Sequence, residues 1–121
     1  GRPGVLSARY LGEGTSFTEK MASLLEELRL TGSDDRRARF VCEAAIADKS
    51  GTILFSARGE CRGKLAAKPA GSNGFGFDPI FIPDGFKQTF GELSAGEKRS
   101  ISHRAAAFEQ IIRYLRENTA V

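Results

Sequence analysis

The chain has 121 residues, with 18 Lys and Arg against 15 Asp and Glu, which gives a formal net charge of +3. This length predicts a single domain, and so small a positive charge argues against a sequence-specific nucleic-acid-binding protein. No apolar run approaches the ~18 residues of a membrane-spanning helix, and no secretory signal pattern is visible. We therefore expect a cytoplasmic protein without a nucleic-acid or membrane partner.

The first predicted element is a helix over residues 17–29, which follows a glycine-rich loop over residues 1–14. Ser16 and Glu19 form a capping-box pattern at its start, and Gly32 is typical of its end. Nothing on this helix suggests chemistry, so we interpret it as a core-packing element. Its apolar face consists of Phe17, Met21, Leu24, Leu25 and Leu28.

Two strands are predicted over residues 39–47 and 52–61, joined by a turn over residues 48–51. If Asp48 faces Gly51, the apolar residues of both strands share one face, as a half-buried hairpin requires. The facing pairs are then Ile46 with Ile53, Ala44 with Phe55, and Cys42 with Ala57.

The two cysteines, Cys42 and Cys61, are too few for a disulfide framework. In the predicted register they are about four residues out of step, or about 14 Å apart, which is beyond the reach of a disulfide. With one histidine in the chain, a structural zinc site is also not expected.

Residues 71–81 read Gly-Ser-Asn-Gly-Phe-Gly-Phe-Asp-Pro-Ile-Phe, and a short strand is predicted over residues 80–82. Glycine permits positive φ and lets another group approach the backbone closely. A flat apolar ring on such a loop would suit a planar ligand such as a base. Taken alone, the segment fits equally well a plain connection whose rings fold back into the core.

Ser94 and Glu97 form a second capping-box pattern, which predicts a short helical turn presenting Lys98. An amphipathic helix is then predicted over residues 102–117, and its start carries Ser102, His103 and Arg104 together. The unpaired amides of a helix start favour a carbonyl or phosphate oxygen. The alternative is that the serine is only a cap and its two neighbours are surface residues.

Residues 71–81 and 97–104 together resemble the inosine triphosphate pyrophosphatase family, as do residues 1–10 and 37–40. The resemblance runs from residue 1 to about residue 117. It implies an α/β fold with a mixed, twisted sheet and flanking helices, in two lobes with the nucleotide in the cleft between them. It also implies a homodimer that uses Mg²⁺ to hydrolyse ITP, dITP and XTP to the monophosphate and pyrophosphate, which removes these nucleotides from the pool.

The resemblance assigns substrate-binding roles to residues of both main segments. The ring of Phe75 is expected to stack on the purine, with Phe77 and Asp78 as pocket wall and polar contact. Donors from His103 and Arg104 would face the 6-keto oxygen and disfavour the amino group of adenine. An unpaired buried donor costs about 1–3 kcal/mol. The expected substrate-binding residues are Phe75, Gly76, Phe77, Asp78, Lys98, Ser102, His103 and Arg104.

The phosphate loop, metal-binding glutamate and catalytic aspartate of the family would lie before Gly1. The resemblance therefore implies no catalytic and no metal-ligating residue within residues 1–121. It implies that these residues form one domain, which matches about the C-terminal two-thirds of the family fold and lacks the family's N-terminal strand and helix. We expect the chain alone to lack significant pyrophosphatase activity and to self-associate. The alternatives are a purine-nucleotide-binding module without catalysis and a structural domain whose glycine loop is only a connector.

Overall fold

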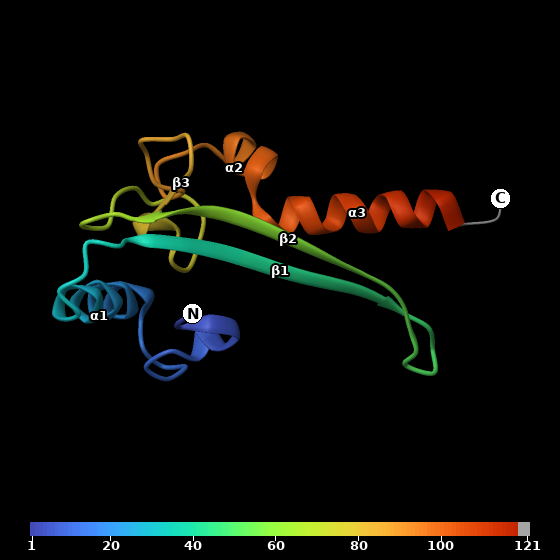
Figure 1. Cartoon of the computed structure of the whole chain (residues 1–121), viewed down its shortest axis with the longest axis horizontal. Helices are drawn as coiled ribbons and strands as arrows, with labels where there is room; N and C mark the ends of the chain where they lie inside the picture. Colours follow the sequence, from blue (N-terminus) through green and yellow to red (C-terminus); the bar gives the residue numbers. More distant parts are fainter. Residues whose placement is uncertain (119–121) are drawn as a thin grey trace.

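The computed structural model describes residues 1–118 as a three-stranded sheet with helices around it (Figure 1). The predicted α/β class with flanking helices is confirmed, and both strand pairs described are antiparallel. Within residues 1–118, none of the helices combines the length and the apolar character needed to span a bilayer. The elements are η1 (Gly4–Arg9), α1 (Phe17–Leu30), β1 (Arg37–Ala47), β2 (Ile53–Leu65), η2 (Asp78–Ile80), β3 (Phe81–Pro83), α2 (Ala95–Ile101) and α3 (His103–Asn118).

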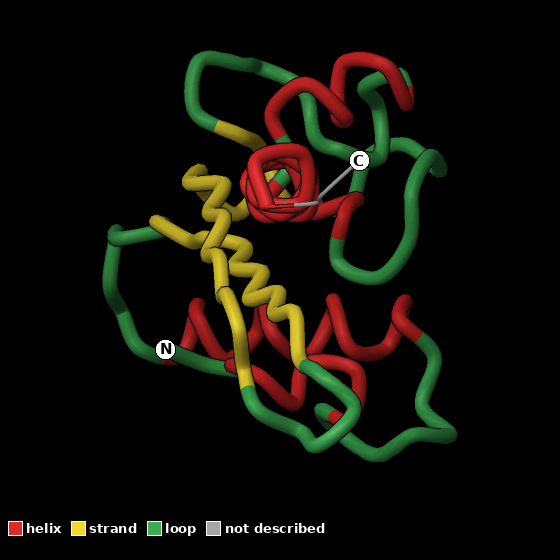
Figure 2. Tube along the Cα trace, turned by 90° about the vertical axis from the view of Figure 1, so that its right-hand side faces the viewer, coloured by secondary structure: helices red, strands yellow, loops and turns green. Residues whose placement is uncertain are grey.

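The sheet has the order β1-β2-β3, and α3 packs against β1 and β2, as the end-on view of this helix shows (Figure 2). Exposed and half-buried residues alternate along β1, as expected when one sheet face is covered and the other is solvated. The solvated face carries charge pairs, among them Arg58 with Glu43 and Glu60, each at 2.9 Å. Because Gly59 has no side chain on the covered face, α3 can approach the sheet closely.

The register of the β1–β2 hairpin differs from the predicted one by two residues. Ile46 faces Phe55 and not Ile53, and the register shifts immediately after Ile46. One residue of this difference arises because Asp48 pairs with Thr52 and not with Gly51: its amide donates to the carbonyl of Thr52 and its carboxylate accepts from the amide of Thr52, each at 3.0 Å. The other arises at Leu54, which has no partner between the pairs Ala47–Ile53 and Ile46–Phe55. A shift of two preserves the faces of both strands, because side chains alternate with a period of two.

The shifted register also corrects the predicted separation of the cysteines. Cys61 faces Phe40, so Cys42 lies two positions from the residue opposite Cys61 and not four. Diagonal neighbours in an antiparallel pair are about 7–8 Å apart, well below the predicted 14 Å. The expectation that the two cysteines are not bridged is confirmed, since both are free.

The helix boundaries follow the predicted local signals closely. The hydroxyl of Ser16 accepts a hydrogen bond of 3.2 Å from the amide of Glu19 at the start of α1. At the start of α2, Ser94 and Glu97 form the complete capping box. Both long helices begin and end within one residue of the predicted limits.

The core lies where β2 and β3 meet the segment before α2. Its buried members are Cys61, Phe81, Phe90 and Leu93. The ring of Phe40 packs on it, with centroids 4.6 Å from Phe81 and 6.1 Å from Phe90. This core supports both segments that the sequence analysis connected with ligand binding.

Candidate functional site

The glycine-rich loop before β3 is held against the backbone of residues 91–93. Gly71 has φ +83°, and a Cβ at this position would lie 2.1 Å from the carbonyl carbon of Gly91. The amide of Asn73 donates to the carbonyl of Gly91 at 2.8 Å, and its side-chain amide donates to the carbonyl of Leu93 at 3.0 Å. The loop therefore has a fixed path, and its first glycine is required by a close backbone approach.

Asp78 is the buried carboxylate that connects this loop to α2. Its side chain is 6% exposed, and its Oδ2 accepts hydrogen bonds from the amide of Phe75 at 2.9 Å and from Lys98 Nζ at 2.6 Å. Gly74, with φ +71°, leaves the space this carboxylate needs, because a Cβ there would lie 2.1 Å from Oδ2. The charge of Asp78 is thus neutralised within the protein, and its ionic partner is fixed in place.

The ring of Phe75 lies exposed beside two cationic side chains. It is 59% exposed, and its centroid lies 4.7 Å from Lys98 Nζ and 4.8 Å from the guanidinium carbon of Arg104. Both distances are within the range of cation–π interactions. Of the two readings that the loop sequence left open, this ring fits the exposed platform and not a ring folded into the core.

Ser102 and His103 occupy the junction between α2 and α3. Ser102 is buried, and its hydroxyl accepts a hydrogen bond of 3.1 Å from the amide of Ala105, so it caps α3. The imidazole of His103 stacks on the ring of Phe40, with centroids 5.0 Å apart and an interplanar angle of 16°. The junction therefore fixes the direction in which the side chains of the first turn of α3 leave the helix.

The surroundings of His103 favour the neutral form of its imidazole, because they lower its pKa. Burial lowers its pKa below 6.5, and the positive charges of Arg104 and Lys98 act in the same direction, whereas Asp78 opposes them. Nδ1 of His103 is buried and has no hydrogen-bond partner among residues 1–118. Such an atom is uncommon in folded proteins and calls for an explanation, such as a ligand or a water molecule.

The remaining two predicted site residues, Gly76 and Phe77, face α1. The ring of Phe77 meets that of Phe17 edge-to-face, with centroids 5.2 Å apart and an angle of 88°. A Cβ on Gly76, which has φ +64°, would lie 3.7 Å from the Phe17 ring. Phe17 and Phe40, which the sequence did not connect with ligand binding, thus contact residues of the predicted site. Phe40 lies in a segment of the family resemblance and Phe17 on the apolar face of a predicted helix, but both contacts join residues distant in the chain, so no local pattern predicts them.

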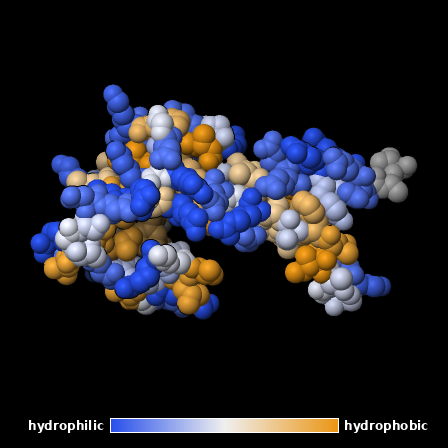
Figure 3. Space-filling model, viewed as in Figure 1, coloured by the Kyte–Doolittle hydropathy of each residue, from blue (hydrophilic) through white to orange (hydrophobic). Residues whose placement is uncertain are grey.

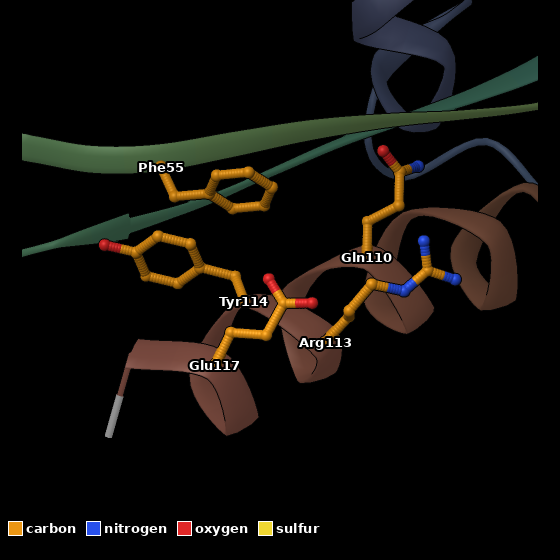
Figure 4. A pocket seen from close by; sticks show the side chains of 5 residues that line it. All are labelled: Phe55, Gln110, Arg113, Tyr114 and Glu117. Carbon is orange, nitrogen blue, oxygen red and sulfur yellow. The ribbon is translucent and has the colours of Figure 1, made fainter. Parts of the chain in front are cut away.

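A separate hollow of about 190 Å³ lies between β2 and the last turns of α3 (Figure 4). The rings of Phe55 and Tyr114 stack along its side at 4.5 Å, with an angle of 11°. The hollow contains none of the eight predicted site residues. Its lining residues are Phe55, Gln110, Arg113, Tyr114 and Glu117.

A metal ion has no evident ligand set in the part of the chain that the structure describes. No group of three His, Cys, Asp or Glu residues lies close enough there to hold one. The carboxylate in the cluster, Asp78, is committed to Lys98. Among residues 1–118 there is thus no ligand set that would hold a metal ion by protein side chains alone, whereas Mg²⁺ commonly binds through one or two carboxylates together with substrate phosphates.

The exposed ring of Phe75 offers a flat apolar contact, and Lys98 and Arg104 beside it offer positive charge, a combination that suits a planar anionic ligand. The model of the Ham1 family matches residues 1–114, and the chain belongs to this family.

The relatives include two bacterial proteins named dITP/XTP pyrophosphatase. The one from Methylacidiphilum infernorum is 43% identical over 118 residues, which cover 98% of this chain and 58% of the relative. The one from Shouchella clausii is 47% identical over 107 residues, covering 88% of this chain and 54% of the relative. The chain thus spans somewhat more than half the length of the curated relatives it matches.

Solved structures of Ham1 proteins share the fold. The Coxiella burnetii HAM1 protein aligns with a TM-score of 0.90 and 38% identity, over 96% of this chain and 59% of that protein. The Staphylococcus aureus Ham1 protein aligns with a TM-score of 0.88 and 35% identity, over 98% of this chain and 60% of that protein. The resemblance stated from the sequence is therefore confirmed at the level of family and fold.

Proposed function

We propose that this protein functions in the hydrolysis of non-standard purine nucleoside triphosphates, namely dITP, XTP and ITP, to the monophosphate and pyrophosphate. The residues described here supply the recognition of the base. The observation that carries the proposal is the exposed ring of Phe75 beside Lys98 and Arg104, with the Asp78–Lys98 pair fixing its surroundings. The names of the relatives support this activity, and a binding module without catalysis is not favoured.

In this proposal the purine stacks on Phe75, because an exposed aromatic ring offers a base a flat apolar contact. Gly76 and Phe77 form the adjoining pocket wall, and Asp78 acts by holding Lys98 and the amide of Phe75. Lys98 and Arg104 attract the anionic nucleotide.

The start of α3 recognises position six of the base. A neutral His103 carries one N–H donor, and Arg104 adds the donors of its guanidinium. These donors suit the 6-keto oxygen of hypoxanthine and xanthine, whereas the amino group of adenine would leave them unpaired. Ser102 contributes by capping α3 and so fixing the direction of both side chains.

Magnesium enters the proposal as the partner of the triphosphate, so the nucleotide would bind as its Mg²⁺ complex. When bound, the ion would neutralise phosphate charge. The proposal assigns none of residues 1–118 as its ligand.

The proposal is tested by isothermal titration with inosine and adenosine 5′-monophosphates, and by release of pyrophosphate from dITP and dATP with Mg²⁺ present. We expect the inosine nucleotide to bind about tenfold more tightly, the effect of roughly one mismatched donor. Equal affinity for the two monophosphates would contradict the assigned base recognition. Measurable turnover of dITP that is matched by turnover of dATP would contradict the proposed substrate class.

We further propose that the protein forms a homodimer and works in the cytoplasm, where it would meet the nucleotide pool. Apolar surface at the tip of the β1–β2 hairpin supports self-association (Figure 3), since Ile53 is 65% and Leu54 is 52% exposed. Sedimentation velocity over a range of concentrations tests the dimer. A monomer at every concentration would contradict it.

A further inference from the structure

The first turn of α1 contacts the glycine-rich loop through an aromatic pair. The ring of Phe17 meets Phe77 edge-to-face at 5.2 Å, which is a favourable geometry for two aromatic rings. The same ring covers Gly76, whose Cβ position lies 3.7 Å away. Phe17 therefore lies against the two residues that follow Phe75 in the chain.

The loop needs such a contact because glycines flank its exposed ring. Gly74 and Gly76 both adopt positive φ, and glycine loses more conformational freedom on ordering than any other residue. The backbone amide of Phe75 is fixed by the carboxylate of Asp78. The side chain of Phe77 is fixed by Phe17, so α1 supplies the second support of this short segment.

The ring of Phe17 is itself held in place by a buried lysine. Lys20 is 1% exposed, and its Nζ lies 4.7 Å from the centroid of the Phe17 ring. The same ammonium donates a hydrogen bond to the carbonyl of Ala8 in η1. A continuous set of contacts therefore runs from η1 through Lys20 and Phe17 to Phe77.

From these contacts we infer that Phe17 is a positioning residue for the base platform, by which we mean the exposed ring of Phe75 with Lys98 and Arg104 beside it. By holding Gly76 and Phe77 it keeps the ring of Phe75 where Lys98 and Arg104 flank it. This inference rests on the proposed function, since it assigns Phe17 a part in the same site. It also gives α1 a role in ligand binding that its sequence pattern did not indicate.

The test uses three variants of the chain: Phe17→Leu, Phe17→Tyr and, as a control, Phe108→Leu. Phe108 is an exposed aromatic residue on α3, remote in sequence from the loop. Hydrogen–deuterium exchange of the peptide covering residues 71–80 reports on the loop without any ligand. Isothermal titration with inosine 5′-monophosphate reports on the platform.

For Phe17→Leu we expect faster exchange in residues 71–80, unchanged exchange in α3, and about two- to tenfold weaker nucleotide binding, the range of one aromatic pair. Phe17→Tyr keeps the ring and is expected to restore both readouts, and Phe108→Leu is expected to match the original chain.

Unchanged loop exchange in Phe17→Leu would overturn the inference, and so would faster exchange with unchanged nucleotide affinity. If Phe17→Leu does not fold, the milder Phe17→Met takes its place. Phe17→Tyr remains the variant that keeps the ring, and the same two readouts decide. If the original chain binds no inosine nucleotide, the proposed base recognition fails, and the exchange measurement alone decides whether Phe17 positions the loop.

Discussion

The ammonium of Lys98 donates a hydrogen bond of 2.6 Å to the carboxylate of Asp78, although 20 residues separate them in the chain. Their side chains are 19% and 6% exposed, so water screens the pair little. The same carboxylate oxygen accepts the amide of Phe75. One buried carboxylate thus joins the glycine-rich loop to α2 and fixes a cation beside the exposed ring.

The substitution Asp78→Asn replaces this carboxylate by a neutral amide and should destabilise the protein. It leaves the ammonium of Lys98 mostly buried without its charged partner. Loss of one member of a buried ion pair costs roughly 3–5 kcal/mol, and the partial exposure of Lys98 places the expected loss at about 2–3 kcal/mol. Urea denaturation measures it. Glu26→Gln is the matched control, since its ion pair with Arg29 is exposed and its midpoint should stay near the original value.

Replacing the exposed ring by Phe75→Ala should weaken nucleotide binding and leave the fold intact. A stacked base contributes about 1–3 kcal/mol, so the affinity for inosine 5′-monophosphate should fall roughly five- to hundredfold. An exposed side chain contributes little to folding, so the free energy of unfolding should change by about 0.5 kcal/mol or less. Titration and urea denaturation of the same preparation separate the two effects. Unchanged affinity would remove Phe75 from the proposed site.

The lowered pKa of His103 predicts a specific pH dependence of stability. In the unfolded chain the imidazole binds a proton near pH 6.5, whereas burial and the charges of Arg104 and Lys98 lower the pKa of the folded form. The unfolded state therefore binds more protons just below pH 6.5, and stability should fall as the pH decreases through that window. The loss ends below the folded pKa.

The variant His103→Gln should lack this component of the pH dependence. The free energy of unfolding is measured for both proteins from pH 8 to pH 5. Subtracting one value from the other at each pH cancels the contribution of the carboxylates, which both proteins share. We expect this difference to vary below about pH 6.5. A constant difference over the whole range would argue against a lowered pKa of His103.

Gly59→Ala should displace the start of α3. The added Cβ would lie 2.0 Å from the carbonyl oxygen of His103 and 2.6 Å from the amide nitrogen of Ala107, and both are backbone atoms that cannot rotate away. We expect a loss of about 1–3 kcal/mol in the free energy of unfolding. Weaker binding of inosine 5′-monophosphate should accompany it. Gly14→Ala is the control, because nothing lies within 4 Å of its Cβ position.

Helices α1, α2 and α3 and the faces of the strands were predictable from local patterns in the sequence, whereas η1 (Gly4–Arg9) lies in a segment predicted as a loop. Ser16 and Ser94 cap the helices that their spacing to a glutamate predicted. The alternation along β1 also appears as predicted. These features depend on hydrogen bonds and side-chain periods within a few residues, so a local pattern is sufficient to predict them. The family followed from two motifs that are continuous in the chain.

The register of the hairpin and the exposure of each aromatic ring in the glycine-rich loop depend on tertiary contacts. The pairing of Asp48 with Thr52 and the unpaired Leu54 together move the register by two residues. The pairing of apolar residues could not reveal this, because both registers bury the same face. The rings of Phe75 and Phe77 are equivalent in sequence terms, yet one lies exposed beside two cations and the other packs on Phe17. The partners of both rings lie more than 20 positions away in the chain, so no local pattern contains these contacts.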